Sequence, residues 1–314
     1  METIDIVAGP VAEPVTLNDV KLELGFGPMQ DSDRAASQLL NDQLRNHIVT
    51  ARDYCEGWCR RVFVTQTWQL LLDSFPSVAL RYDRNGYPEI WLPKPPFQSV
   101  VSFTYVDTSG ATQTLTQDAS YGVNLAAPFY GYQLSRGSRT QPARLLPPWA
   151  RPWAPQRMVP DNTVVRFRCG YGGPITCSMT AGSAVLTVSG GAPLSFDADD
   201  APLLPQETGL PIFVPGAGPT SGTVISPITN HPVTGALATN IASVNPSNGQ
   251  ATLAAVATTT VTNVPGWAGR PVPARITHAI RRLAAYCYDN RGESVAENEE
   301  FIQNLLKPFR NDVS

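Results

Sequence analysis

Three histidines and five cysteines are the side chains of this sequence best suited to catalysis or metal binding. The histidines are His47, His231 and His278, and no two of them have the spacing of a metal-binding motif. No Cys-x-x-Cys pair occurs. Cys55 follows His47 by about two turns of a predicted helix, which is too far for proton transfer between the two side chains. We therefore expect no catalytic residue, no metal site and no cofactor, and we predict that the protein is not an enzyme.

The odd number of cysteines favours free thiols over a disulfide framework. Cys55 and Cys59 lie four residues apart in a predicted helix, which puts them on one face but not in disulfide geometry. Cys169 and Cys177 flank a Gly-Gly-Pro turn and could meet across it, and Cys287 occupies an apolar helical position. We expect these thiols to be reduced and mostly buried.

Two short motifs contain the residue types of a ligand site. Asp197, Asp199 and Asp200 could supply oxygen ligands to calcium, but the glycine-kinked loop and distal glutamate of a calcium-binding loop are missing. A solvated acidic turn is the preferred interpretation. The glycines within 170–173 lead into Pro174 rather than into a helix, which argues against a phosphate-binding loop and predicts a hinge.

Residues 145–160 are rich in proline and tryptophan and predict an extended, ordered loop. Trp149 and Trp153 are its most prominent side chains, and three arginines lie close by: Arg144, Arg151 and Arg157. This composition suits a nucleic-acid stacking groove, a protein–protein contact surface or an intramolecular brace. We prefer a partner surface, with Trp149 and Trp153 as candidate interface residues.

Helices are predicted near both ends of the chain because apolar residues recur there every three or four positions. The expected ranges are 16–24, 33–61, 271–290 and 294–308. Thr16 and Asp19 form a capping box at the first helix, and Ser294 and Glu297 form another at the last.

Runs of branched and aromatic residues separated by turn residues predict strands between the second and third helices. The expected strands are 63–72, 89–92, 99–106, 112–115, 122–125, 132–134 and 163–168. A sheet placed between helices in this way predicts an α+β fold.

No lysine or arginine occurs between Arg168 and Arg270, although the chain has 23 of them. The stretch carries four acidic residues, so its formal charge is −4, against +1 (23 minus 22) for the rest. It consists mainly of Thr, Ser, Ala, Gly, Pro and Val, which favour strands and turns. We predict two domains: a frame of residues 1–174 and 270–314, and an insert of residues 175–269 folded as an all-β sandwich or barrel.

The composition also argues against several classes of protein. A net charge of −3 disfavours a general nucleic-acid binder. The apolar runs are shorter than the ~18 residues that a membrane-spanning helix needs. The first ten residues lack the layout of a signal peptide, so we expect an intracellular protein at synthesis.

Several segments of the frame together carry a family resemblance. They are residues 15–21, 51–56, 67–70 with 75–76, 90–93 with Pro96 and 99–100, 105–107 with Gly110, 164–171 (VVRFRCGY) and 273–291. In their order and spacing they resemble the head–tail connector (adaptor) proteins of tailed bacteriophages.

The resemblance implies a helical connector core of two N-terminal and two C-terminal helices with a short-stranded sheet. It implies a structural protein of the virion neck, made in the bacterial cytoplasm, that forms a ring of twelve copies following the portal's symmetry. The ring would join the portal to a tail-side neck, stopper or tail-terminator protein, extend the DNA channel and serve DNA ejection. Genomic DNA would pass through the lumen without specific binding, and no membrane is involved.

In this family the C-terminal segment commonly reaches the portal. Here the resemblance assigns that role to an amphipathic anchor, with candidate portal-binding residues Phe301, Ile302, Leu305, Leu306 and Phe309. The same apolar pattern would arise if the segment docked on its own core. Three residues of the long helix are candidates for contacts between subunits, which a closed ring requires: Arg45, Arg52 and Glu56.

The insert has a resemblance of its own, carried by residues 182–188, 211–218, 239–244 and 251–261. These resemble a small β module attached to various phage structural proteins. We favour decoration of the neck or contacts within it. The alternative function is phage surface decoration or binding of a host glycan by the insert, with Trp267 or Phe213 as the stacking aromatic residue.

Overall fold

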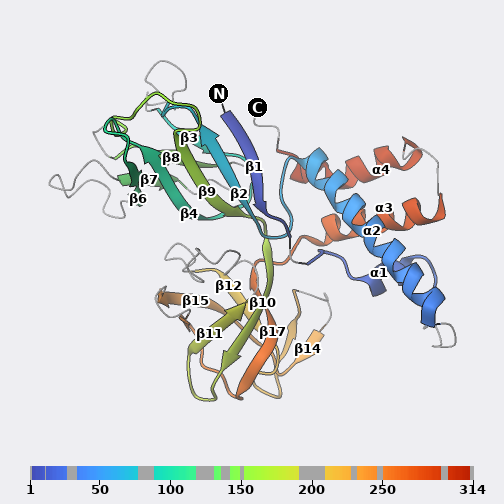
Figure 1. Ribbon diagram of the computed structural model, residues 1–314. Coiled ribbons are helices and arrows are strands. Elements are labelled where there is room, and N and C mark those ends of the chain that lie inside the picture. Colours follow the sequence, from blue (N-terminus) through green and yellow to red (C-terminus); the bar gives the residue numbers. More distant parts are fainter. Residues whose placement is uncertain are drawn as a thin grey trace.

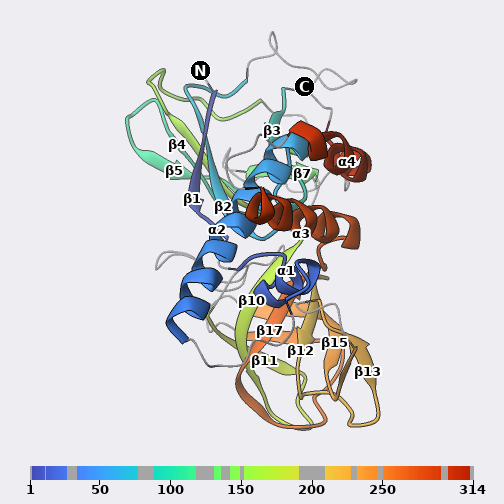
Figure 2. The ribbon, with the colours of Figure 1, turned by 90° about the vertical axis from the view of Figure 1, so that its right-hand side faces the viewer.

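The computed structural model describes residues 2–10, 12–26, 34–76, 88–117, 131–135, 142–148, 152–190, 209–227, 232–245, 250–290 and 296–311. These residues form a sandwich of two β-sheets, a layer of helices beside it, and a β-barrel (Figure 1). Figure 2 shows the helical layer in front of the sandwich and the barrel below both.

The helical layer consists of α1 (Leu17–Glu23), α2 (Arg34–Cys59), α3 (Ala274–Asp289) and α4 (Ala296–Leu306), followed by the short 3-10 helix η3 (Lys307–Phe309). The helices are amphipathic, and α3 lies in the centre, in contact with the other three. Their shared apolar core includes Leu44 and Ile48 of α2, Ile276 and Ile280 of α3, and Leu306 of α4.

The start of α1 confirms the first predicted capping box. Thr16 Oγ1 accepts a hydrogen bond from the Asp19 amide (3.2 Å), and Asp19 Oδ2 accepts one from the Thr16 amide (3.0 Å). Gly25 follows the helix with φ of 72°, a left-handed conformation that glycine adopts without strain. Ser294 of the second predicted capping box lies outside the described residues.

The first sheet of the sandwich is antiparallel, with the strand order β1-β2-β9-β4-β5. Its strands are β1 (Glu2–Ala8), β2 (Gln66–Leu72), β4 (Phe97–Val106), β5 (Thr112–Thr114) and β9 (Thr163–Cys169). The edge strand β1 has no counterpart among the predicted strands. It pairs with β2 from Glu2 opposite Leu72 to Ile6 opposite Trp68.

The second sheet has the order β3-β8-β7-β6. Its strands are short: β3 (Ile90–Leu92), β6 (Thr116–Gln117), β7 (Gly131–Ser135) and β8 (Ala143–Leu146). The second half of β8 falls in the segment predicted as a loop. The predicted strand at 122–125 lies outside the described residues. Both sheets bury one face in a common core that includes Leu92, Phe103, Tyr132, Leu145 and Phe167.

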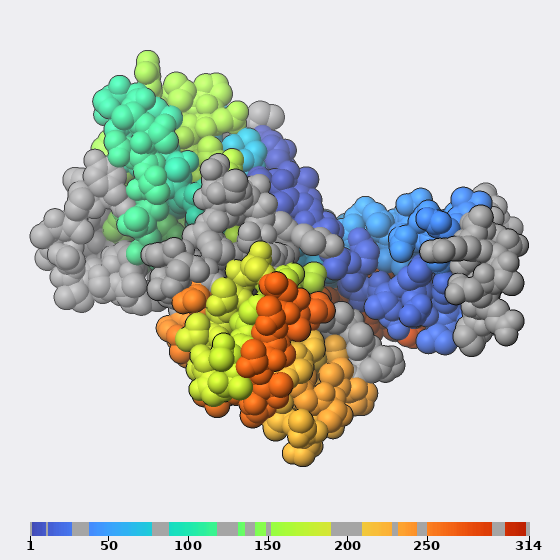
Figure 3. Space-filling model, turned by 60° about the horizontal axis from the view of Figure 1, so that its bottom comes forward, coloured from blue at the N-terminus to red at the C-terminus, as the bar shows by residue number. Residues whose placement is uncertain are grey.

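The barrel is closed by six strands in the order β10-β11-β16-β15-β12-β17. They are β10 (Gly172–Met179), β11 (Val185–Gly190), β12 (Pro211–Val214), β15 (Leu237–Asn245), β16 (Gln250–Leu253) and β17 (Val261–Gly269). A two-stranded sheet of β13 (Thr223–Ile225) and β14 (Pro232–Thr234) accompanies it. In Figure 3 the barrel, in yellow to orange, protrudes from the rest of the molecule.

The chain enters and leaves the barrel at a single crossing. Gly172 of β10 is paired with Gly269 of β17, and the Arg270 amide donates a hydrogen bond to the Tyr171 carbonyl (2.7 Å). A Cβ atom on Gly172 would lie 2.6 Å from the Ala268 carbonyl oxygen, so the two strands can approach this closely only with glycine at that position. Residues 172–174 therefore belong to a strand and not to a turn between Cys169 and Cys177.

The predicted α+β fold with a helical connector core is wrong. Of the described residues, 42% lie in strands and 25% in helices. The strands of the frame form a sandwich with an apolar core distinct from that of the helical layer. The second sheet is built from strands of two to five residues, and β1 pairs with a strand more than fifty residues away. Short strands, and strands that pair with distant segments, produce little local periodicity in the sequence, so the sandwich was not predicted.

Candidate functional site

The outward side of α2 forms an exposed stripe. Leu39, Asp42, Asn46, Val49 and Asp53 follow one another at alternating spacings of three and four residues, so they share one face of the helix. All five are exposed, and the buried residues of α2 lie on the opposite face, toward α3. We call these five residues the α2 stripe.

Arg45, a predicted interface residue, lies beside the α2 stripe. Its guanidinium contacts the Asp42 carboxylate at 2.9 Å, and the two side chains are 64% and 58% exposed. An ion pair this exposed adds little to stability, so both groups are available to a partner.

Arg52, also predicted for an interface, is buried within the chain, with 7% of its side chain exposed. Its Nε donates to Glu13 Oε2 at 2.8 Å, and its Nη1 lies 3.2 Å from Asp53 Oδ1 and 3.6 Å from Glu56 Oε2. One guanidinium thus forms ion pairs with three carboxylates and connects the segment before α1 to α2.

Glu56 connects the end of α2 to the sandwich. Its carboxylate accepts hydrogen bonds from the Phe63 amide (2.6 Å) and from Gln66 Nε2 of β2 (3.2 Å). Burial raises the pKa of Glu56 to about 7, although the Phe63 hydrogen bond and the charge of Arg52 favour its ionised form. The structure places Arg52 and Glu56 at an internal junction, and it places Arg45 on the surface.

The C-terminal segment docks on its own chain. Ile302 and Leu306 are buried in the core of the helical layer, and Leu305 and Phe309 pack partly against it. Phe301, the remaining predicted anchor residue, is 45% exposed.

Polar contacts extend this docking along the whole segment. The Tyr54 hydroxyl of α2 donates to Glu299 Oε1 at 2.6 Å. The Arg310 guanidinium lies 5.2 Å from the centre of the Trp58 ring, and the Asn311 amide donates to the Cys59 carbonyl at 2.9 Å. Burial, followed by the Glu299 carboxylate, raises the pKa of Tyr54 to about 12, which keeps the hydroxyl protonated as a donor.

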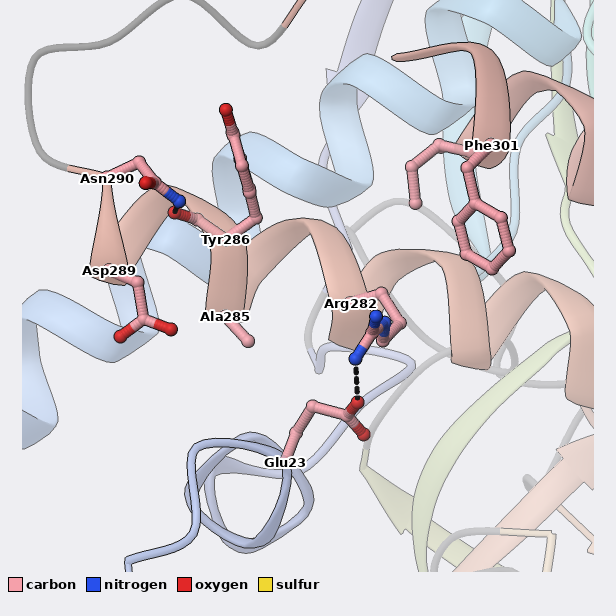
Figure 4. Close-up of a pocket in the computed structure, with 8 residues that line it drawn as sticks. Glu23, Arg282, Ala285, Tyr286, Asp289, Asn290 and Phe301 are labelled. Atoms are coloured by element: carbon pink, nitrogen blue, oxygen red, sulfur yellow. Dashed lines mark hydrogen bonds and ion pairs between the residues drawn. The ribbon is translucent and has the colours of Figure 1, made fainter. Parts of the chain in front are cut away.

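A pocket of about 160 Å³ opens between α1, α3 and α4. Figure 4 shows it in front of α3, with α2 behind. Its lining residues are Glu23, Arg282, Ala285, Tyr286, Asp289, Asn290, Phe301 and Ile302. Except for Phe301 and Ile302, none of these is among the predicted site residues. The pocket results from the packing of α1 and α4 on α3, which the pattern of each helix alone does not reveal.

Glu23 of the pocket is shared by two arginines. Arg281 Nε lies 2.8 Å from Glu23 Oε2, and Arg282 Nη1 lies 2.9 Å from Glu23 Oε1. Burial acts to raise the pKa of Glu23, but the Arg282 hydrogen bond and the two guanidinium charges together leave it below its usual value. Two positive charges therefore face one carboxylate.

Trp153 lies in the core of the sandwich as an intramolecular brace. It stacks on Phe75 with ring centres 5.0 Å apart, and its indole N–H donates to the Pro88 carbonyl at 3.1 Å. Arg144, one of the nearby arginines, pairs with the buried Glu89 carboxylate at 3.0 Å. Trp149 and Arg151 lie outside the described residues.

The aromatic residues suggested for glycan stacking are inside the barrel. Phe213 and Trp267 are both buried, and with Ala236 they form a small core against the β13-β14 sheet. The Trp267 indole N–H donates to the Arg270 carbonyl at 3.3 Å. Neither ring face is open to a sugar.

The remaining candidates from the sequence are dispersed. The His47 ring meets Tyr288 edge-on at 6.3 Å, and His278 Nδ1 lies 3.0 Å from Arg281. His231 and the acidic run at 197–200 lie outside the described residues. Within the described ranges, no group of three or more histidine, cysteine or acidic side chains is arranged to hold a metal ion.

All five cysteines are free. As predicted, four are buried: Cys55, Cys59, Cys169 and Cys177. Cys169 belongs to the core of the sandwich and Cys177 to the core of the barrel, so they do not meet. None of the helices in the described part is long and apolar enough to span a lipid bilayer.

No protein-family model and no curated protein matches this chain. A solved chain from the neck of an empty gene transfer agent (GTA) particle, computed with C6 symmetry, is 12% identical, with a TM-score of 0.48 over 99% of this chain and 97% of that one. A chain from the virion of a native GTA particle is 13% identical, with a TM-score of 0.47 over 99% and 97%. A chain from the neck of a native GTA particle, computed with C12 symmetry, is 11% identical, with a TM-score of 0.43 over 98% and 97%.

Proposed function

We propose that this protein is a structural component of the neck of a tailed phage or phage-like particle. In this proposal it forms a ring that joins the portal of the capsid to a tail-side neck protein, and DNA passes through the ring.

The observation that carries the proposal is that the connector-like segments fold together. Residues 67–70, 99–100, 105–107 and 164–171 lie in or next to the adjacent strands β2, β4 and β9. Residues 51–56 and 273–291 correspond to the end of α2 and to α3, which pack against each other. Segments that are scattered in the sequence therefore form one continuous frame.

The insert interrupts the frame in the sequence but not in space. The chain departs after β9 and returns before α3 at the paired glycines Gly172 and Gly269. We propose that residues 175–269 form a separate domain and that the frame alone carries the connector function. The insert would then decorate the neck or contact a neighbouring neck protein.

Two ionisable groups with shifted pKa values link elements of the frame. Glu56 joins α2 to β2, and Tyr54 joins α2 to α4. Contacts of this kind hold the helical layer against the sandwich and hold α4 against α2.

In the proposed assembly the C-terminal segment attaches to the portal. Because Ile302 and Leu306 are buried in the chain's own core, the half-buried Leu305 and Phe309 are the apolar residues of the segment left for the portal, apart from Phe301, which is assigned below to a contact between copies. Attachment through the buried face would first require α4 to leave its site.

Imaging tests this function. We expect the purified chain, alone or mixed with its portal, to give rings with a central channel in electron micrographs. A variant lacking residues 297–314 should leave heads without attached tails. If the chain stays monomeric in the presence of the portal, and particles without it still carry tails, the neck assignment is wrong.

A further inference from the structure

Two faces on opposite sides of the helical layer lie at the surface of the chain. One is the α2 stripe. The other, which we call the pocket flank, consists of Glu23, Arg282, Tyr286, Asp289 and Phe301 around the pocket. α3 separates them, because the pocket lies in front of α3 while α2 lies behind it (Figure 4).

Both faces expose large apolar side chains. Phe301 of the pocket flank is 45% exposed, and Val49 and Leu39 of the α2 stripe are 37% and 64% exposed. Apolar groups of this size gain from burial against a matching surface. The pocket beside Phe301 provides a concave site for one of them.

The charges of the two faces are complementary. Around Arg52, three carboxylates share one guanidinium, and Asp53 is the most exposed of them at 63%. Around Glu23, two guanidiniums share one carboxylate, and Arg282 is the more exposed at 51%. The α2 stripe is therefore negative around Asp53, and the pocket flank is positive around Arg282.

A second pair of charged residues determines the relative direction of α2 in one copy and α3 in the other. Arg45 lies eight residues before Asp53 on α2, about 12 Å along the helix, and Asp289 lies seven residues after Arg282 on α3, about 10.5 Å along it. All four residues are exposed. If α2 of one copy runs antiparallel to α3 of another, Asp53 meets Arg282 while Arg45 meets Asp289.

We propose that the α2 stripe of one copy docks on the pocket flank of a second copy, with Asp53 beside Arg282 and Val49 beside Phe301. This inference rests on the proposed ring function and names its subunit contact. The two faces differ and lie on opposite sides of each copy, so the contact is head-to-tail and repeats around a ring.

Mixing two singly blocked variants tests the contact. Val49→Glu disables the α2 stripe, and Phe301→Glu disables the pocket flank, because either puts an unpaired carboxylate into the contact. We expect each variant alone to associate on the order of tenfold more weakly or worse and to sediment as a monomer where the wild type forms rings. An equimolar mixture should give a one-to-one heterodimer and nothing larger, because only one productive pair of faces remains.

The controls separate this inference from the proposed function. Met158→Glu changes an exposed residue outside the helical layer and should form rings like the wild type, and thermal melting should show that all variants are folded. The double variant Asp53→Arg with Arg282→Glu should recover association that each single change loses. If the wild type forms rings and both blocked variants still do, or if Val49→Glu alone self-associates, the contact is wrong while the ring stands. If the wild type forms no ring even with the portal, the proposed function fails.

Discussion

The chemistry of Glu56 depends strongly on its place in the fold. Its pKa is raised from 4.5 to about 7 by burial, so the folded state binds a proton more tightly than the unfolded state. The stabilising contribution of this carboxyl group is therefore fully present below pH 4.5 and is lost as the pH rises through about 7. By this shift the loss is up to about 3 kcal/mol. We predict that the free energy of unfolding, measured by urea titration, falls relative to that of Glu56→Gln over this pH range.

Asp42→Asn is the matched control for this prediction, because Asp42 is an exposed carboxylate of the same helix. Its stability curve should run parallel to that of the wild type between pH 5 and 8. Parallel curves for the wild type and Glu56→Gln would show that Glu56 does not titrate in this range.

At the scale of elements, substitutions in α4 test whether its apolar face packs on the chain's own core or is left free for the portal. Leu306 is fully buried against the helical layer, so Leu306→Ala should lower the free energy of unfolding by about 2–5 kcal/mol. Phe301→Ala, on the exposed side of the same helix, should cost less than about 1 kcal/mol. Equal and small effects in the free chain would mean that α4 does not rest on its own core in solution.

The elements differ in how well the sequence alone predicts them. The helices were predictable because apolar residues such as Leu44 and Ile48 recur at helical spacing, and the Thr16–Asp19 pair marks a start. β1 was missed although Ile4 and Ile6 alternate with polar residues, because only its pairing with β2 makes it a strand. The pocket could not be predicted, since Glu23, Arg282 and Phe301 meet only after three helices have packed.

At the scale of the whole molecule, the crossing at the base of the barrel makes the frame and the barrel separable. Gly172 and Gly269 are direct partners in an antiparallel pair, so a two-residue turn can join them. We predict that replacing residues 173–268 with Asn-Gly leaves a folded frame that still forms the proposed rings, measured by circular dichroism and electron microscopy. An Asn-Gly variant that is unfolded or aggregated would show that the frame needs the barrel for its stability.

The lack of basic residues in the barrel has a practical consequence for proteolysis. Trypsin cleaves after lysine and arginine, and between Arg168 and Arg270 it finds no site. Arg168 is fully buried in the sandwich, and Arg270 is followed by Pro271, which blocks cleavage. Tryptic digestion of the folded protein would therefore report on opening of the frame alone and would leave the barrel within one long fragment.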